Sequence, residues 1–303
     1  MDRRVARRLM RVPARVVIGH DGSALHAARA ARATGGLTVL NQVIGHLEHG
    51  LTLGREEAER APQFAESMPD SPAWIVERHR AELAETDRVI VPSDYVRDTV
   101  VAHGTEASRV FVLPYGVDTR RFRPPERPRE PDGKFRVLFV GALTQRKGIK
   151  YLLEAAKRAD IKGLELVCVG KLAGDAAAFA PYADVFRHVR HVPFHEVHLL
   201  FQTADVFAYP SLHEGSAFAS YEALASGLPV VCTPNTGSVV RDGIEGYIVP
   251  VRDVEALVER LRRLARDPDL RARMALAART RAEDFTWTHY GARLATWLDA
   301  QIS

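Results

Sequence analysis

Short apolar runs alternate with stretches of helical periodicity along almost the whole chain. In the first part, four runs predict strands at about 14–19, 37–43, 88–92 and 109–113. In the second part, six runs do so: FRVLFVG, LELVCVG, DVFRHVR, DVFAYP, PVVCT and GYIVP. Strands separated by helical segments are typical of parallel α/β sheets. The pattern therefore predicts an α/β protein with two doubly wound domains, the second of which carries a complete sheet.

A stretch rich in proline and charge interrupts this pattern and divides the chain. The run RFRPPERPREPDGK has no helical or strand periodicity, as expected of an interdomain linker. We predict a first domain over 1–122, a linker over 123–134 and a second domain over 135–285. The last segment, 286–303, predicts a helix with a broad apolar face. That face consists of Trp287, Tyr290, Leu294 and Trp297.

The composition excludes several classes of protein. The 303 residues are 46% hydrophobic and 26% charged, and no apolar run is long enough to span a bilayer. Cys168 and Cys232 each lie in a strand-like run, which predicts buried core residues in a reducing cytoplasm rather than a disulfide. Neither a Cys/His cluster with metal spacing nor an Asp-Xaa-Asp motif at a strand end is present, so no metal site is expected. We expect the turn Asp267-Pro268-Asp269 to cap helices instead.

The chain is mildly basic, with a formal charge of +4 and an isoelectric point of about 9.2. This charge permits contact with an anionic membrane or a lipid phosphate without requiring either. Six arginines fall within the first fifteen residues, where a nucleic-acid arm and a transit-like segment are alternatives. The apolar stripe of Val5, Leu9 and Met10 favours an ordinary surface helix over 2–11, with membrane-surface contact as the second interpretation.

The most informative stretch is HEGSAFASYEALASGLPVVCTP, in which Glu214 and Glu222 stand eight residues apart. Taken as helical, at ~1.5 Å per residue, the spacing separates the carboxylates by roughly 12 Å, about the distance from the ribose to the sugar of a nucleotide sugar. A helix that starts between them offers unpaired N–H groups and its positive end to a diphosphate. Two solvated glutamates on a helix are the alternative.

The pattern Glu, seven residues, Glu, then Ala-Xaa-Ala-Xaa-Gly-Xaa-Pro resembles the donor-site motif of the retaining family 4 glycosyltransferases of the GT-B fold. Other motifs similar to that family's follow the same order: VPSDYVRDTVVAHG, LPYGVDTRRFRP, FVGALTQRKGIKYLLEA and NTGSVVRDGIEGYIVPVRD. The resemblance covers nearly the whole chain and implies two Rossmann-like domains. It also implies transfer of a hexose from UDP- or GDP-hexose to a glycan or lipid-linked acceptor, with retention, in cell-surface polysaccharide or glycoconjugate synthesis.

The resemblance further implies a donor-binding turn from Gly141 to Gly148, at the end of the second domain's first strand. Lys147 matches the family's lysine, which neutralises the diphosphate. The position of the family's arginine holds Ala142, and Arg146 is the alternative source of the second charge.

By the same resemblance, Glu214 contacts the hydroxyls of the donor sugar and Glu222 those of the ribose. Where many members have Gly-Phe-Gly-Leu after the first glutamate, this chain has Gly215, Ser216, Ala217 and Phe218. We expect backbone N–H groups of 217–219 to contact the phosphates, with Gly237 as a second close approach. Val192-Pro193-Phe194 falls where such folds hold the base.

The first domain is expected to supply the acceptor side. His46 matches a histidine that the family often places close to the reacting sugar, so His46, Glu214 and Lys147 are the predicted catalytic residues. His20, at the end of the first strand, is a further candidate on the acceptor side. Both histidines have the alternative of being loop residues without a role. Ser93 is interpreted as the N-cap of the helix that follows it.

Four strands are visible where the first domain of a GT-B protein usually has about seven, so this domain is predicted to be truncated. The open strand edge would be covered by another chain or by the helix over 2–11, or the sequence is an incomplete version of a longer protein, which we favour. The alternative function is therefore a catalytically incomplete nucleotide-sugar-binding or partner-dependent subunit. We expect no cofactor, metal-independent transfer and no nucleic-acid partner, in the cytoplasm or at the inner face of an anionic membrane.

Overall fold

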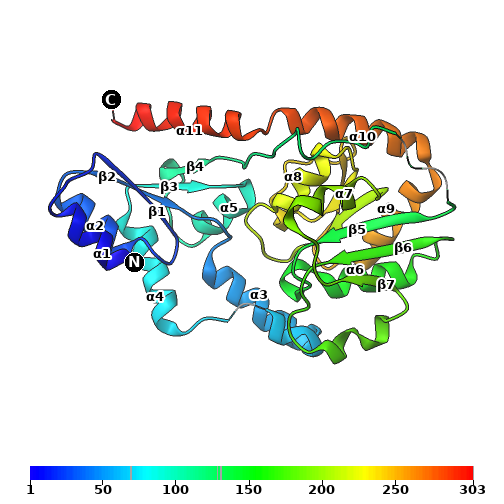
Figure 1. Ribbon diagram of the computed structural model, residues 1–303. Helices are drawn as coiled ribbons and strands as arrows, with labels where there is room; N and C mark the ends of the chain where they lie inside the picture. The colour runs from blue at the N-terminus through cyan, green and yellow to red at the C-terminus, as the bar shows by residue number, and fades with distance from the viewer. Residues whose placement is uncertain (69, 128, 130–131, 303) are drawn as a thin grey trace.

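The computed structural model describes residues 1–68, 70–127, 129 and 132–302. Within these residues the chain forms two lobes that lie side by side, each built on a parallel β-sheet covered by helices (Figure 1). We call residues 1–113 the N-lobe and residues 135–285 the C-lobe. The predicted α/β class and the two separate sheets are confirmed.

The N-lobe sheet has the order β1-β2-β3-β4. Its strands are β1 (Val16–His20), β2 (Leu37–Asn41), β3 (Arg88–Val91) and β4 (Val110–Val112), close to the four predicted runs. Among the described residues β1 pairs only with β2, and its Ile18 side chain is 43% exposed. This edge of the sheet is therefore open in the part of the chain that the structure describes.

The C-lobe sheet has the order β10-β9-β8-β5-β6-β7, and all six predicted runs form its strands. They are β5 (Phe135–Val140), β6 (Leu164–Val169), β7 (Phe186–Val189), β8 (Val206–Tyr209), β9 (Val230–Cys232) and β10 (Gly246–Ile248). The central strands are buried on both faces, which explains why they appear as continuous apolar runs. Strand order reverses between β5 and β8, and such a switch point leaves a crevice at the carboxyl ends of the strands.

Helices cover both sheets. In the N-lobe they are α1 (Asp2–Leu9), α2 (Leu25–Ala33), α3 (Leu47–Arg60), α4 (Ala73–Glu85) and α5 (Asp94–Ala102), with the 3₁₀ segments η1 (Pro62–Ser67) and η2 (Ala107–Arg109). In the C-lobe they are α6 (Ile149–Arg158), α7 (Val197–Phe201), α8 (Phe218–Ala225), α9 (Val254–Arg266) and α10 (Pro268–Glu283), with η3 (Gln145–Lys147), η4 (Ala176–Tyr182), η5 (Phe194–Glu196) and η6 (Pro234–Thr236).

Side chains cap several of these helices. Ser93 accepts a hydrogen bond from the Val96 N–H, and Asp267 accepts one from the Leu270 N–H, as predicted for both. Cys168 and Cys232 are buried and free, again as predicted. No helix of the described residues is long and apolar enough to cross a membrane.

The last helix, α11 (Trp287–Ile302), leaves the C-lobe and lies along the N-lobe sheet (Figure 1). Tyr290, Leu294 and Trp297 pack against the sheet, and the Trp297 ring stacks on Phe111 at 4.8 Å between centroids. Trp287 departs from the predicted apolar face. It is 49% exposed because it lies beyond the sheet, beside Phe218 of α8.

The first helix, α1, is a surface helix, as predicted. It packs against α2 rather than over the open edge of β1, which was one of the alternatives for covering that edge. Leu9 is buried, whereas Val5 and Met10 are 40% and 58% exposed. Because α1 has only eight residues and packs on one neighbouring helix, it buries fewer side chains than the predicted apolar stripe contains.

Helix α3 belongs to the N-lobe in sequence but packs on the C-lobe (Figure 1). Ala61 and Phe64, directly after it, are buried in the large apolar cluster of the C-lobe, with Phe64 edge-to-face on Phe179 at 5.2 Å. The carboxylate of Glu57 is fully buried beside the C-lobe residues Gln145, Tyr151 and Arg252. The two lobes are therefore joined by α3 as well as by the linker and α11.

Candidate functional site

The turn after β5 lies at the switch point of the C-lobe sheet. Gly141 has a φ of 148°, and a Cβ there would lie 3.0 Å from both the Lys147 Nζ and the Tyr209 hydroxyl. Gly148 has a left-handed φ of 71°, and a Cβ there would lie 1.9 Å from the Pro210 carbonyl oxygen. Both glycines are required because the turn after β5 packs tightly against the residues after β8. The predicted donor-binding turn is thus built into the crevice of the sheet.

Three of the predicted site residues converge in this crevice. The Glu214 Oε2 lies 3.0 Å from the Arg146 Nη1 and 3.7 Å from the Lys147 Nζ. Lys147 also donates a hydrogen bond to the Tyr209 hydroxyl. Burial lowers the pKa of Lys147, with Glu214 opposing that effect. Arg146 therefore supplies a second positive charge beside Lys147, although position 142, where the family has its arginine, holds Ala142.

Glu214 is well placed to accept hydrogen bonds from a ligand. Its side chain is only 15% exposed, and its Oε2 makes ion pairs with the two cations but accepts no hydrogen bond from the described residues. A buried carboxylate oxygen that lacks a hydrogen bond is costly, and a ligand hydroxyl would relieve that cost.

Gly215 lies where the C-lobe touches the N-lobe. A Cβ at Gly215 would be 1.7 Å from the carbonyl oxygen of Val43, so only glycine fits there. The Ser93 hydroxyl donates a hydrogen bond to the Gly215 carbonyl oxygen at 2.5 Å, in addition to its capping role. Gly237 is also close, because a Cβ there would lie 2.1 Å from the same carbonyl. Gly215 and Gly237 thus allow two segments of the backbone to approach each other closely.

The helix that follows begins later than predicted. α8 starts at Phe218, so Glu222 lies one turn into it and Glu214 lies in the preceding loop. The separation expected from the helical rise therefore does not hold, because only part of the interval between the two glutamates is helical. The Ala217 N–H donates to the Thr236 carbonyl, so it is not free for a phosphate as expected. Ser216 is buried and bonded to Tyr221 and to the Gly237 carbonyl.

Glu222 is a mostly buried carboxylate without a hydrogen-bond partner or an ion pair among the described residues. Burial raises its pKa to about 7, and the positive charge of Arg121 opposes the shift. Arg121 comes from the linker region and was not predicted; its guanidinium lies 3.9 Å from the centroid of Phe194, in the segment expected to hold a base. Nothing in the proline-rich run around Arg121 indicates from the sequence that this residue lies beside Phe194.

The candidates of the N-lobe lie apart from this cluster. His20 is exposed at the end of β1, 3.3 Å from the Asn41 side chain. The next residue, Asp21, was missed by the sequence analysis although it follows the same strand directly. Burial raises the pKa of Asp21 to about 6, helped by the negative charge of Glu82. The negative charges of Asp21 and Glu214 both help to raise the pKa of Tyr115, after burial and two neighbouring tyrosines.

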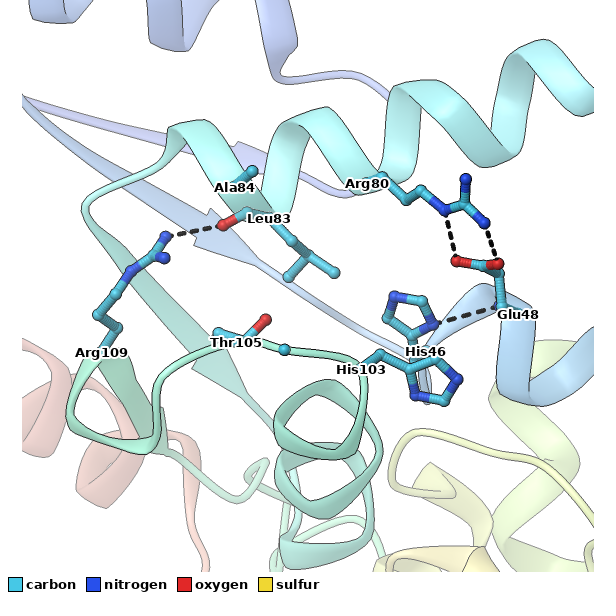
Figure 2. Close-up of a pocket in the computed structure, with 9 residues that line it drawn as sticks. His46, Glu48, Arg80, Leu83, Ala84, His103, Thr105 and Arg109 are labelled. Carbon is cyan, nitrogen blue, oxygen red and sulfur yellow. Dashed lines mark hydrogen bonds and ion pairs between the residues drawn. The ribbon is translucent and has the colours of Figure 1, made fainter.

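The structure places His46 in a separate cluster of histidines (Figure 2). Its ring is 2% exposed, stacks on His103 at 4.0 Å and meets His79 edge-to-face at 5.0 Å. Its Nδ1 accepts a hydrogen bond from the Glu48 N–H, which makes His46 the N-cap of α3. Burial and the neighbouring histidines lower its pKa to about 3, so the ring stays neutral.

This cluster lines a cavity of about 290 Å³ on the N-lobe. Figure 2 shows the Glu48–Arg80 ion pair beside the two stacked rings and Arg109 on the far wall, where it donates to the Leu83 carbonyl. The His46 side chain is thus not brought together with Lys147, Arg146 and Glu214, and its catalytic role stays a prediction. No group of three or more potential ligands among the described residues is arranged to hold a metal ion.

Comparison with known proteins gives two family matches that together span most of the chain. Residues 121–281 match the family described as Glycosyl transferases group 1. Residues 1–121 match the family described as Glycosyltransferase Family 4.

Individual relatives give the same result. The chain is 33% identical over 224 residues to a D-inositol 3-phosphate glycosyltransferase of Paenarthrobacter aurescens, which covers 66% of this chain and 54% of the relative. It is 28% identical over 314 residues to an alpha-maltose-1-phosphate synthase of Mycolicibacterium smegmatis, covering 90% and 80%. The chain spans about half the length of the first group of curated relatives that it matches.

Solved structures share the fold. A sucrose-phosphate synthase of Thermosynechococcus elongatus superposes with a TM-score of 0.73 at 20% identity, covering 95% of this chain and 73% of that one. The HepE protein of Anabaena, solved in complex with UDP, superposes with a TM-score of 0.73 at 16% identity, covering 98% and 81%.

Proposed function

Because the chain belongs to the family 4, group 1 glycosyltransferases of the GT-B fold, we propose that it transfers a hexose from a UDP- or GDP-sugar to a glycan or lipid-linked acceptor, with retention of configuration. The observation that carries this proposal is the convergence of Lys147, Arg146 and Glu214 at the switch point of the C-lobe sheet. Cell-surface polysaccharide or glycoconjugate synthesis is the proposed setting.

The donor would bind along the crevice with its parts matched to separate groups. Glu222, without a hydrogen-bond partner among the described residues, suits the two ribose hydroxyls, and Phe194 with Arg121 suits the base. The start of α8 together with Lys147 and Arg146 suits the diphosphate, whose negative charge needs cations and N–H donors. Glu214, bonded to neither cation by a hydrogen bond, suits the hydroxyls of the hexose.

Transfer would follow from these positions. As the bond from the sugar to the diphosphate breaks, negative charge grows on the leaving oxygen, and Lys147 and Arg146 stabilise it. The acceptor hydroxyl attacks from the same face, and the departing phosphate takes its proton. Since protein cations meet the charge, we propose that transfer needs no metal, and turnover in excess EDTA is expected to equal turnover without it.

The acceptor would occupy the N-lobe side of the crevice, and Asp21, whose carboxyl has a pKa raised by burial to about 6, is a candidate to contact it. The names of two relatives contain a phosphorylated polyol and a phosphorylated sugar, so soluble sugar phosphates belong in an acceptor panel beside lipid-linked glycans. Peripheral attachment to an anionic membrane is proposed only for the lipid-linked case. The second candidate, a partner-dependent nucleotide-sugar-binding subunit, is favoured by Ala142, which stands where the family's arginine was expected.

One experiment separates these proposals. UDP, GDP and ADP are titrated calorimetrically, and the nucleotide that binds is then supplied as its hexose conjugates with and without acceptors. Binding with release of the nucleoside diphosphate supports the transferase. Binding without release, with every acceptor, supports the subunit, and no binding at all removes both.

Replacing Glu222 with glutamine should weaken nucleotide binding at pH 8 by about 1–3 kcal/mol, the value of hydrogen bonds to a charged group. Since the pKa of Glu222 is raised to about 7, the wild-type carboxylate is mostly protonated at pH 6 and mostly ionised at pH 8. The ionised form is the stronger acceptor for the two ribose hydroxyls, so the difference between wild type and variant should shrink at pH 6. Calorimetry at pH 6, 7 and 8 measures it.

The matched control is Glu259→Gln, whose side chain is 69% exposed on α9 and should leave affinity unchanged at each pH. The same shift affects stability. Because the folded state favours the protonated carboxyl, Glu222 should lower stability as pH rises from about 4.5 through 7, and the variant should lack that decline. Equal affinity of Glu222→Gln and wild type at pH 8 would remove Glu222 from the ribose role.

A further inference from the structure

His213, the residue before Glu214, inserts its side chain into the opposite lobe. It belongs to the C-lobe, is 2% exposed, and lies against Gly45, Gly50 and Tyr95 of the N-lobe. We call these three residues the His213 socket. Neither these three residues nor His213 was a candidate in the sequence analysis.

Two glycines make room for the imidazole. A Cβ at Gly45 would lie 2.6 Å from the His213 Cε1, and a Cβ at Gly50 would lie 2.6 Å from its Nε2. Neither glycine has a left-handed φ, so the backbone itself does not require glycine at these positions. The requirement is the volume of the His213 ring.

The third member of the socket fixes the ring by a hydrogen bond. The Tyr95 hydroxyl and the His213 Nδ1 are 2.7 Å apart. Which of the two atoms donates depends on the tautomer of the ring. Burial lowers the pKa of His213 to about 3, so the socket holds a neutral imidazole.

The chain on either side of His213 is fixed as well. The His213 carbonyl accepts from the Arg146 Nη1 at 2.7 Å. The Glu214 carbonyl accepts from the N–H of Gly45 at 3.3 Å, and the Gly215 carbonyl accepts from Ser93. Three consecutive residues are thus anchored, and the anchors of Glu214 and Gly215 belong to the N-lobe.

We propose that His213 is a positioning residue, which through its socket on the N-lobe holds the Glu214 carboxylate beside Lys147 and Arg146. This inference rests on the proposed function, in which Glu214 binds the donor sugar. It assigns the N-lobe a part in donor recognition, since the sugar-binding carboxylate is placed by residues of the other lobe. The nucleotide part of the donor does not depend on the socket, because Glu222 and Phe194 lie beyond it in the C-lobe.

The contact should also respond to acid. The groups that face His213 are His49 of α3, Tyr95 of α5, Arg146 of η3 and its neighbour Glu214. Since its pKa is lowered when seated, the seated ring is favoured fully above its ordinary pKa of about 6.5 and loses that advantage as pH falls towards 3. For each pH unit below 6.5, the ratio of seated to displaced ring falls up to about tenfold.

The experiment uses His213→Gln, Tyr95→Phe and Gly50→Ala in the full chain, with His289→Gln on the exposed side of α11 as the histidine control. Affinity for the free nucleoside diphosphate is compared with turnover of the sugar donor. We expect the three variants to keep nucleotide affinity within about twofold and to lose about tenfold or more in donor turnover. The control should match wild type in both, and a merely structural role would lower both together.

A second readout does not depend on activity. In NMR titrations, His213 of the wild type should stay neutral down to below pH 5, whereas in Gly50→Ala, where the socket is filled, its pKa should return towards 6.5. Titration of wild-type His213 near 6.5, or full donor turnover in Gly50→Ala with a displaced ring, would overturn the inference. If no nucleotide binds to the wild type, the proposed function fails, while the NMR result still decides whether the ring is seated.

Discussion

Replacing Glu57 with alanine is expected to lower the free energy of unfolding by about 3–5 kcal/mol, the cost of removing one partner from a buried charged network. The Glu57 carboxylate is fully buried and accepts from the Gln145 Nε2 at 2.6 Å, the Tyr151 hydroxyl at 2.9 Å and the Arg252 Nε at 2.6 Å. Alanine would leave the buried amide and hydroxyl without this acceptor, and would leave Arg252 with only Glu56. Urea titration followed by circular dichroism measures the change.

The neighbouring glutamate provides a matched control for Glu57. The Glu56 side chain is 45% exposed and pairs with the same arginine at 2.7 Å. Exposed pairs contribute at most about 1 kcal/mol, so Glu56→Ala should change stability by no more than that. Similar losses in the two variants would show that the charge of α3, rather than the buried network, matters.

Replacing Lys147 with alanine is expected to slow donor turnover by about 10²–10³-fold, the usual cost of losing one group that stabilises charge in a transition state. The ammonium group is held in the crevice between the Tyr209 hydroxyl and the Glu214 carboxylate. It lies in the turn after β5, where the diphosphate of the donor is proposed to bind. Release of UDP or GDP from the hexose donor, at saturating donor concentration, measures the effect.

The control for Lys147 is Lys162→Ala, because Lys162 is exposed in the turn before β6, at the sheet edge opposite the crevice, and should leave turnover within twofold. Arg146→Ala should show a loss comparable to that of Lys147→Ala if Arg146 replaces the arginine missing at Ala142. Undiminished turnover in Lys147→Ala would contradict the proposed stabilisation of the leaving group.

The strands and the donor loop could be predicted because their signals are local. VFAY is apolar throughout and LELVCV is apolar except for Glu165, a pattern typical of strands buried on both faces. The turn between Gly141 and Gly148 follows such a strand directly, so its place at the sheet's carboxyl edge follows from the order of elements. The turn, together with the resemblance to family 4, is what pointed to Lys147, Arg146 and Glu214 as parts of one site.

The contacts between the lobes could not be predicted in this way. Glu57 stands in GREEAER, where its neighbours are partly or fully exposed, and nothing in that run distinguishes the buried carboxylate. His46 was chosen for its place after the second strand, but the cap of α3 and the stacking on His103 turn its ring into the N-lobe. His213 and Gly50 lie far apart in sequence, so their fit appears only in three dimensions.

The course of α3 has a consequence for dividing this protein into parts. The linker over 123–134 is the obvious place to cut, yet Phe64 and Ala61, from before it, complete the apolar core on the other side. A fragment starting at residue 135 would expose the surface on which Phe179 receives Phe64, and would leave Tyr151 without the carboxylate it binds. A chimera in which the C-lobe is exchanged between relatives would have to include α3 and η1, because these two segments pack on the C-lobe. The folded unit around the C-lobe core is therefore discontinuous in sequence.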